Sequence, residues 1–186
     1  MRAGSTGYEK SFKSGWEVSR YERPDNIGRD KIQAHEIAKY SNGVVVGTTE
    51  ANIKYMGLIK AVFDQVPEAV TCFVSMPNAI MGFAVSHTYF DSKLIPESYI
   101  MLKNVVQLPY GSSSEFVASN MSTATPVAVI DNECVVAIGK NITKAFDRME
   151  VLDFSARSVI SATNIAKITP INDEQTADID RTFNGW

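Results

Sequence analysis

Hydrophobic and polar positions follow two different periods along the chain, which predicts that strands and helices are both present. Short runs rich in β-branched residues, mostly bounded by turn residues, predict strands over residues 44–46, 70–74, 105–108, 127–130 and 134–138. Apolar residues at helical spacing predict helices over residues 53–65, 78–85 and 142–160, with Asn141 as the N-cap of the last. A short helix is expected from Asp173, while residues 32–40 could form a helix or a strand leading into the Asn42-Gly43 turn.

The apolar stripe of the long helix defines the face that we expect to be buried. Position 152 or 153 completes one turn of this stripe, so Leu152 and Asp153 are alternatives there. The other members of the stripe are Ile142, Phe146, Met149, Ala156, Val159 and Ile160.

The order of these elements indicates the fold class. Strands and helices alternate, but short turns join several strand pairs, so a purely parallel sheet is not expected. A chain of 186 residues with 45% hydrophobic residues is long enough for one compact core. We therefore predict a single α/β domain over residues 1–186, with a mixed, largely antiparallel sheet between helices.

Composition excludes some classes of function. The formal net charge is -3 and basic residues are not clustered, so the sequence lacks the electrostatic pattern of a nucleic-acid-binding protein. No apolar run approaches the roughly 20 residues that a membrane-spanning helix needs. Cys72 and Cys134 lie in apolar runs, where a thiol behaves as a small hydrophobic group. A cytoplasmic protein without a membrane partner is expected.

Histidine is scarce, which bears on metal chemistry. The chain contains only His35 and His87, far apart in sequence and without a nearby cysteine. A catalytic zinc ion usually has three protein ligands, most often with at least two histidines. The sequence is therefore poorly supplied for zinc catalysis, and we expect two ordinary histidines.

Several blocks of sequence, in order, resemble the class II aldolase/adducin superfamily, which includes zinc-dependent fuculose- and rhamnulose-phosphate aldolases, ribulose-phosphate epimerases and the adducin head domain. The blocks are residues 4–9, 58–67, 70–77, 95–110, 128–162 and 172–186. The resemblance implies a three-layer α/β/α domain with a mostly antiparallel sheet. It also implies a homo-oligomer, usually a tetramer, with active sites between subunits. The family's opening helix and Gly-Asn-x-Ser phosphate loop have no counterpart in this sequence.

The resemblance also implies where a zinc ion would be held, and the required residues are missing. The family's His-x-His strand falls on Val74 and Met76, and the histidine of its Asn-His-Gly turn falls on Glu133. A valine side chain has no ligand atom, and a methionine thioether is too soft for a Lewis-acid role. We therefore expect no cofactor, with a divalent metal bound through Glu133 as the alternative.

Candidate acid–base residues are also placed by the resemblance. The carboxylate of the family's Ser-Ser-Glu motif falls on Tyr55 in a gap-free count, whereas Thr48, Thr49 and Glu50 would restore the motif if an insertion followed them. Tyr99 lies near the position of the family's proton-donating tyrosine, although a half-buried structural tyrosine is the alternative.

The sequence near the start offers a candidate anion site. Gly7 and the preceding Ser5 and Thr6 could bind a phosphate through backbone N–H groups and hydroxyls, or could be part of a plain flexible terminus.

Two functions remain open at this point. One is a lyase- or isomerase-type enzyme acting on a small sugar-like or phosphosugar-like hydroxy-carbonyl compound, with Glu133, Tyr99 and Glu50 as working groups. The other is a non-catalytic oligomeric binding or scaffold module, like the adducin head.

Overall fold

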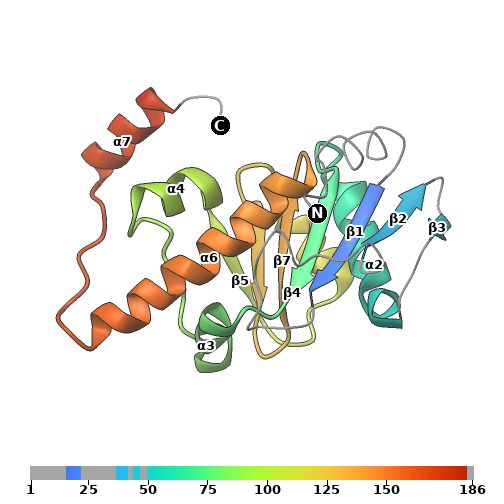
Figure 1. The fold of residues 1–186 in the computed structure, drawn as a ribbon, viewed down its shortest axis with the longest axis horizontal. Coiled ribbons are helices and arrows are strands. Elements are labelled where there is room, and N and C mark those ends of the chain that lie inside the picture. Colours follow the sequence, from blue (N-terminus) through green and yellow to red (C-terminus); the bar gives the residue numbers. More distant parts are fainter. Residues whose placement is uncertain (1–15, 22–36, 42–43, 47–49, 184–186) are drawn as a thin grey trace, which may run out of the picture.

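One mixed sheet organises the chain (Figure 1). The computed structural model describes the backbone of residues 16–21, 37–41, 44–46 and 50–183, and the side chains of residues 55–183. The sheet has seven strands in the order β3-β2-β1-β4-β7-β6-β5. The strands are β1 Trp16–Tyr21, β2 Ile37–Ser41, β3 Val44–Val46, β4 Thr71–Ser75, β5 Val105–Leu108, β6 Val127–Ile130 and β7 Cys134–Gly139. Only the β1–β4 and β5–β6 pairs are parallel, which confirms the prediction of a mixed, mostly antiparallel sheet.

Helices cover both faces of this sheet and make the expected three layers (Figure 1). On one face lie α2, Glu50–Gln65, and α5, Ser114–Ser119. On the other lie α3, Asn78–Ser86, α4, Pro96–Leu102, and α6, Ile142–Thr163. The last helix, α7, Asp173–Thr182, contacts α4 rather than the sheet.

The central strands are buried on both faces, which explains why their sequences are continuous apolar runs. In β4, Cys72 and Val74 face α2 and α5, whereas Phe73 faces the opposite layer, where its ring meets Phe146 edge-on at 6.0 Å between centroids. All six residues of β7 are buried. Strand alternation therefore divides one run of apolar residues between two separate cores.

Most predicted elements are present, and the alternative left open for residues 32–40 is resolved. Residues 37–41 form a strand, paired with β3 across the Asn42-Gly43 position, as the hairpin alternative requires. The helix predicted from residue 53 begins earlier, at Glu50. In α6 the amide of Lys144 donates to the Asn141 side chain at 2.7 Å, so the predicted N-cap is confirmed.

The apolar stripe of α6 differs from the prediction at two positions. Ile160 is 43% exposed, because the last turns of α6 extend beyond the sheet (Figure 1). Leu152 and Asp153 are both buried, although they were alternatives. Asp153 is buried because its Oδ1 accepts hydrogen bonds from the amides of Ala79 and Ile80, at 2.8 and 3.3 Å. The carboxylate thus takes the place of a side-chain cap at the start of α3, where Pro77 provides none.

The two cysteines form no disulfide and are fully buried, as the sequence predicts. Burial raises the pKa of the Cys72 thiol far above its ordinary value, with the nearby Cys134 as a second cause. Since the thiolate is the reactive form, these cysteines act as small core residues.

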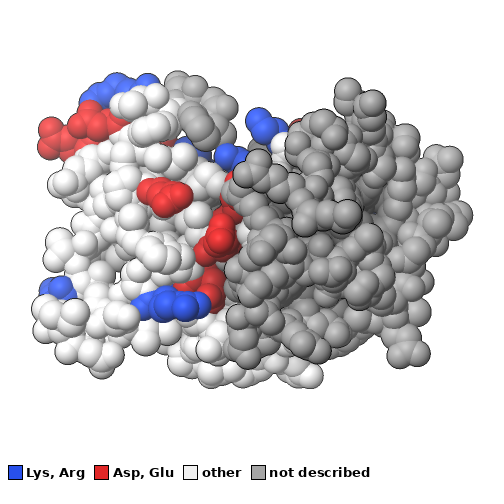
Figure 2. All heavy atoms as spheres, in the orientation of Figure 1, with Lys and Arg blue, Asp and Glu red and all other residues white. Residues whose placement is uncertain are grey.

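On the face shown in Figure 2, acidic and basic side chains gather over α7, and further charged side chains lie across the middle of the described surface. This helix has Asp173 and Glu174 in its first turn and Arg181 in its last. Charges in this arrangement interact favourably with the helix dipole. Within residues that the structure describes, no helix is long and apolar enough to cross a bilayer.

Candidate functional site

The turn between β6 and β7 is where the family resemblance locates a metal-binding histidine. Ile130 and Cys134 pair across this turn, and the amide of Glu133 donates to the Ile130 carbonyl at 3.1 Å. Asn132 at the tip has a φ of 55°, a left-handed conformation that asparagine tolerates better than most residues. The turn presents one carboxylate, Asp131, to the α3 layer and a second, Glu133, to a pocket in the α2 layer.

Asp131 is buried and holds the turn in place. Its Oδ1 accepts a hydrogen bond from Gln107 Nε2 at 2.7 Å, and its Oδ2 lies 2.9 Å from His87 Nδ1. Because a carboxylate only accepts, the imidazole donates through Nδ1, which leaves Nε2 as the outward nitrogen. His87 itself follows α3 in a left-handed conformation and its side chain is 63% exposed.

The His87–Asp131 contact was missed by sequence reasoning, which treated His87 as an ordinary histidine. The only signal was the acidic residue opening the turn, and nothing local connects it to a residue 44 positions away. The pair has the arrangement of an oriented imidazole next to a carboxylate, a device that can support acid–base chemistry.

Glu133 lies in a pocket of about 110 Å³ between the turn, α2 and the start of α5. Tyr55, which is only 5% exposed, is part of the same lining. The remaining lining residues are Gly57, Leu58, Ser112, Ser114, Val117 and Ile130. Two positions that the resemblance relates to catalysis, the metal-turn position and the gap-free position of the general base, therefore come together.

Val74 and Met76 lie at the end of β4, next to the start of β7. Val74 pairs with Val136 and is 1% exposed, within the apolar core under α2. Met76 follows the strand and is 37% exposed. A metal site at this edge of the sheet would take its ligands from the end of β4 and from the turn before β7.

The residues present do not fit the three-histidine zinc centre of the family. The three corresponding side chains offer a hydrocarbon, a thioether and one carboxylate, whereas zinc prefers several nitrogen, thiolate or carboxylate ligands. Among residues 55–183, no three His, Cys, Asp or Glu side chains come together in a metal-binding arrangement. We therefore derive no chemistry through a zinc ion.

Tyr99 belongs to a different contact. Its hydroxyl donates to Asp180 Oδ2 at 2.8 Å, and Lys103 Nζ lies 3.3 Å from Asp180 Oδ1 and 5.4 Å from the centre of the Tyr99 ring. The hydrogen bond to Asp180 is the main cause that raises the pKa of Tyr99, followed by burial. Here Tyr99 attaches α7 to α4 and does not line the Glu133 pocket; its role as a proton donor stays a prediction.

The other predicted site residues lie at or beyond the limits of the described part. Glu50 is the first residue of α2, but its side chain is outside the described residues. Six more residues that the sequence analysis singled out lie wholly outside the described part. They are Ser5, Thr6, Gly7, His35, Thr48 and Thr49.

Comparisons with known proteins bear on the fold. No family model and no curated protein matches the chain. Among solved structures, an L-fuculose 1-phosphate aldolase from Glaciozyma antarctica PI12 has a TM-score of 0.65 at 17% identity, over 78% of this chain and 59% of that one. An aldolase II superfamily protein from Pseudomonas syringae has a TM-score of 0.62 at 14% identity, over 84% and 66%.

A further L-fuculose 1-phosphate aldolase has a TM-score of 0.59 at 18% identity, covering 83% of this chain and 75% of that one. The chain thus spans less than two thirds of the Glaciozyma antarctica enzyme's length, at 59%. These structural likenesses give this chain the class II aldolase-like fold.

Proposed function

We propose that this protein is a divergent relative of class II aldolases that has lost the three-histidine zinc chemistry and transfers protons on a small hydroxy-carbonyl compound. The observation that carries this proposal is that Glu133 and Tyr55 line one polar pocket at the edge of the sheet. Both occupy positions that correspond to active-site groups of the family. The chemistry is that of an isomerase or lyase that needs no cofactor.

The pocket offers the groups that such a reaction requires. The Glu133 carboxylate can take a proton from the hydroxyl-bearing carbon beside a carbonyl and return it to the carbonyl carbon, while the hydroxyl proton passes to the former carbonyl oxygen, so that protons balance over one turnover. The hydroxyl groups of Tyr55 and Ser114 can donate hydrogen bonds to the substrate oxygen on which negative charge develops. The small volume, about 110 Å³, favours a short-chain substrate or the reactive end of a longer one.

Solvent-proton exchange tests this proposal. Purified protein in deuterium oxide is incubated with short-chain hydroxy-aldehydes and hydroxy-ketones, with and without a phosphate group, and deuterium incorporation is followed by proton NMR. Glu133→Gln should slow exchange by about a hundredfold or more, since a general base typically contributes that much. Tyr55→Phe should slow it less.

Glu150→Gln is the matched control, because Glu150 is an exposed carboxylate on α6, away from the pocket. It should leave exchange unchanged. Equal exchange by the wild-type protein and Glu133→Gln would contradict the proposal, as would the absence of exchange with every compound.

A second candidate function is a non-catalytic, homo-oligomeric binding or scaffold module. The pocket of about 110 Å³ supports it, because small-molecule sites usually measure about 300 Å³ or more. Large apolar side chains are also exposed on the described part of the chain, and burying them in an interface would favour assembly. These side chains include Val85, Tyr89, Tyr110, Phe116, Phe154, Ile160 and Ile165. Under this alternative, Glu133→Gln and Tyr55→Phe change no measurable property.

We propose a homo-oligomer under either function, with a tetramer as the form that the family resemblance suggests. Light scattering on the purified protein measures its mass in solution. A monomer at every concentration would contradict this assembly.

A further inference from the structure

A second pocket lies at the opposite end of β7 from Glu133. It has a volume of about 240 Å³, more than twice that of the Glu133 pocket. Ile138 and Gly139 at the end of β7 form its floor, and Thr123 and Glu68 come from two neighbouring loops. Since β7 has six residues and a strand rises about 3.3 Å per residue, the two pockets are about 20 Å apart.

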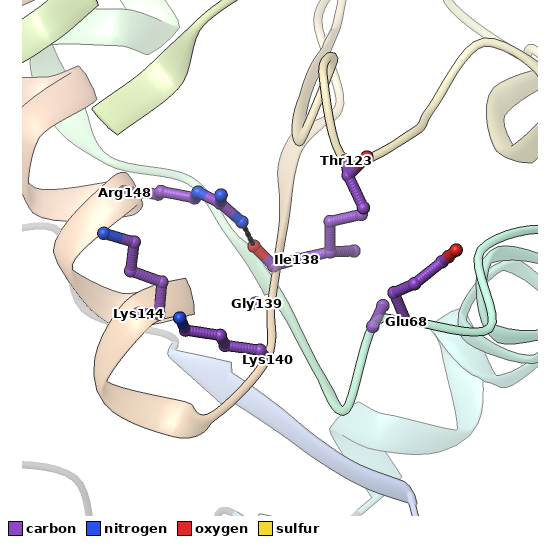
Figure 3. Close-up of a pocket in the computed structure, with 8 residues that line it drawn as sticks. Glu68, Thr123, Ile138, Gly139, Lys140, Lys144 and Arg148 are labelled. Carbon is purple, nitrogen blue, oxygen red and sulfur yellow. Dashed lines mark hydrogen bonds between the residues drawn. The ribbon is translucent and has the colours of Figure 1, made fainter. Parts of the chain in front are cut away.

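Three basic residues dominate the lining of this basic pocket, as we call it. Lys140 precedes α6, and Lys144 and Arg148 follow at intervals of four residues, so all three lie along one side of the helix start. Figure 3 shows the three on one side of the end of β7, with Glu68 and Thr123 on the other. Glu68, the only acidic residue of the described lining, extends away from the three bases in this view and forms no ion pair with them.

Arg148 is held rigidly at the pocket. Its Nε donates to the Met101 carbonyl at 3.1 Å and its Nη1 to the Ile138 carbonyl at 2.5 Å. Neither bond neutralises the guanidinium charge, because both acceptors are backbone carbonyls. The N–H groups on Nη2 of Arg148 make no hydrogen bond within the described residues. They remain available to an oxyanion, which a planar guanidinium group binds well.

Positive charge is crowded in the basic pocket. The pKa of Lys144 is lowered by burial first and then by Arg148 and Lys140, with Asp147 acting in the opposite direction. Burial also lowers the pKa of Arg148. The N-terminus of α6, a helix of 22 residues, adds partial positive charge at the same place. An anion bound here would relieve this repulsion.

From this cavity, its three bases and the fixed guanidinium, we propose that the basic pocket binds a small doubly charged oxyanion, a phosphate group borne by a small molecule. Three bases and one carboxylate give the described lining a formal charge of 3 − 1 = +2, which matches a phosphate dianion. The site is separate from the Glu133 pocket and does not depend on the function proposed there.

Titration with inorganic phosphate tests this site. Binding is measured by calorimetry and by the shift in melting temperature, with sodium chloride at matched ionic strength as the reference, because screening alone alters surface electrostatics. Phosphate should bind and raise the melting temperature of the wild-type protein. Lys144→Gln and Lys140→Gln should each weaken phosphate binding about tenfold, because each removes a charge-assisted hydrogen bond.

Two controls separate this site from other effects. Lys167→Gln removes an exposed lysine outside the pocket lining and should leave phosphate binding unchanged. Glu133→Gln should also bind phosphate normally, so failure of the function proposed above does not affect this result. Undetectable binding by the wild-type protein would overturn the proposal, as would binding by Lys140→Gln and Lys144→Gln that is as tight as that of the wild-type protein. Because both lysines lie at the surface end of α6, circular dichroism can verify that the variants are folded.

Discussion

Gly139→Ala is expected to destabilise the protein severely, by about 3 kcal/mol or more, since overpacking a tight site costs this much when the backbone must move. A Cβ atom at Gly139 would lie 2.5 Å from the Ala145 amide nitrogen and 2.9 Å from the Asn141 carbonyl oxygen. Both neighbours are backbone atoms of the first turn of α6, which cannot rotate away as a side chain could. Chemical denaturation of Gly139→Ala and of the wild-type protein under the same conditions measures the loss in the free energy of unfolding.

Gly82→Ala is the matched control for that substitution. A Cβ at Gly82 would meet only the Ile160 Cδ1 atom, at 3.9 Å, which is an ordinary contact. Gly82 lies within α3, where replacing glycine by alanine should stabilise the protein by about 0.5–1 kcal/mol. Equal free energies of unfolding for the two variants would show that α6 does not pack against β7 as described.

Asp153→Ala should have the second largest effect, a loss of about 3 kcal/mol in the free energy of unfolding. The substitution removes two hydrogen bonds from a buried carboxylate to amides at the start of α3, and each bond to a charged group contributes about 1.5–3 kcal/mol. It also removes a negative charge at the positive end of that helix. Thermal and urea unfolding both measure this loss.

Arg157→Ala separates the helix cap from the ion pair. Arg157 Nη2 lies 2.9 Å from Asp153 Oδ2, but the arginine side chain is 67% exposed. Because the guanidinium is largely in solvent, although Asp153 is buried, the ion pair should contribute less than about 1 kcal/mol. If Arg157→Ala cost as much as Asp153→Ala, the ion pair rather than the cap would be the source of the stability.

The fold could be predicted from sequence to a large extent because local patterns determine most of its elements. The β6–turn–β7–α6 segment is an example: two apolar runs, a polar turn, Gly139 and an asparagine cap specify it within one stretch. The position of Asp153 could not be predicted, because its partners are the amides of Ala79 and Ile80 in another helix. Periodicity placed it near the buried face, but only tertiary structure explains a buried carboxylate there.

The site was predictable only in part, for the same reason. The resemblance locates the family's zinc histidines at Val74, Met76 and Glu133, and the absence of histidine at these positions can be read directly from the sequence. Tyr55 and Glu133 line one pocket, and His87 donates a hydrogen bond to Asp131. Both arrangements depend on how α2 and α3 pack at one end of the sheet. The basic pocket was missed because three bases at intervals of four residues are ordinary on an exposed helix, and only the cavity beside β7 distinguishes them.

We propose that this class II aldolase-like fold works without the zinc centre of the family. Elemental analysis of protein purified without chelators tests it most directly, with Glu133→Gln analysed in parallel. We predict that neither protein contains stoichiometric zinc, manganese or magnesium, and that both are equally folded. A stoichiometric divalent ion in the wild-type protein that Glu133→Gln releases would contradict the claim.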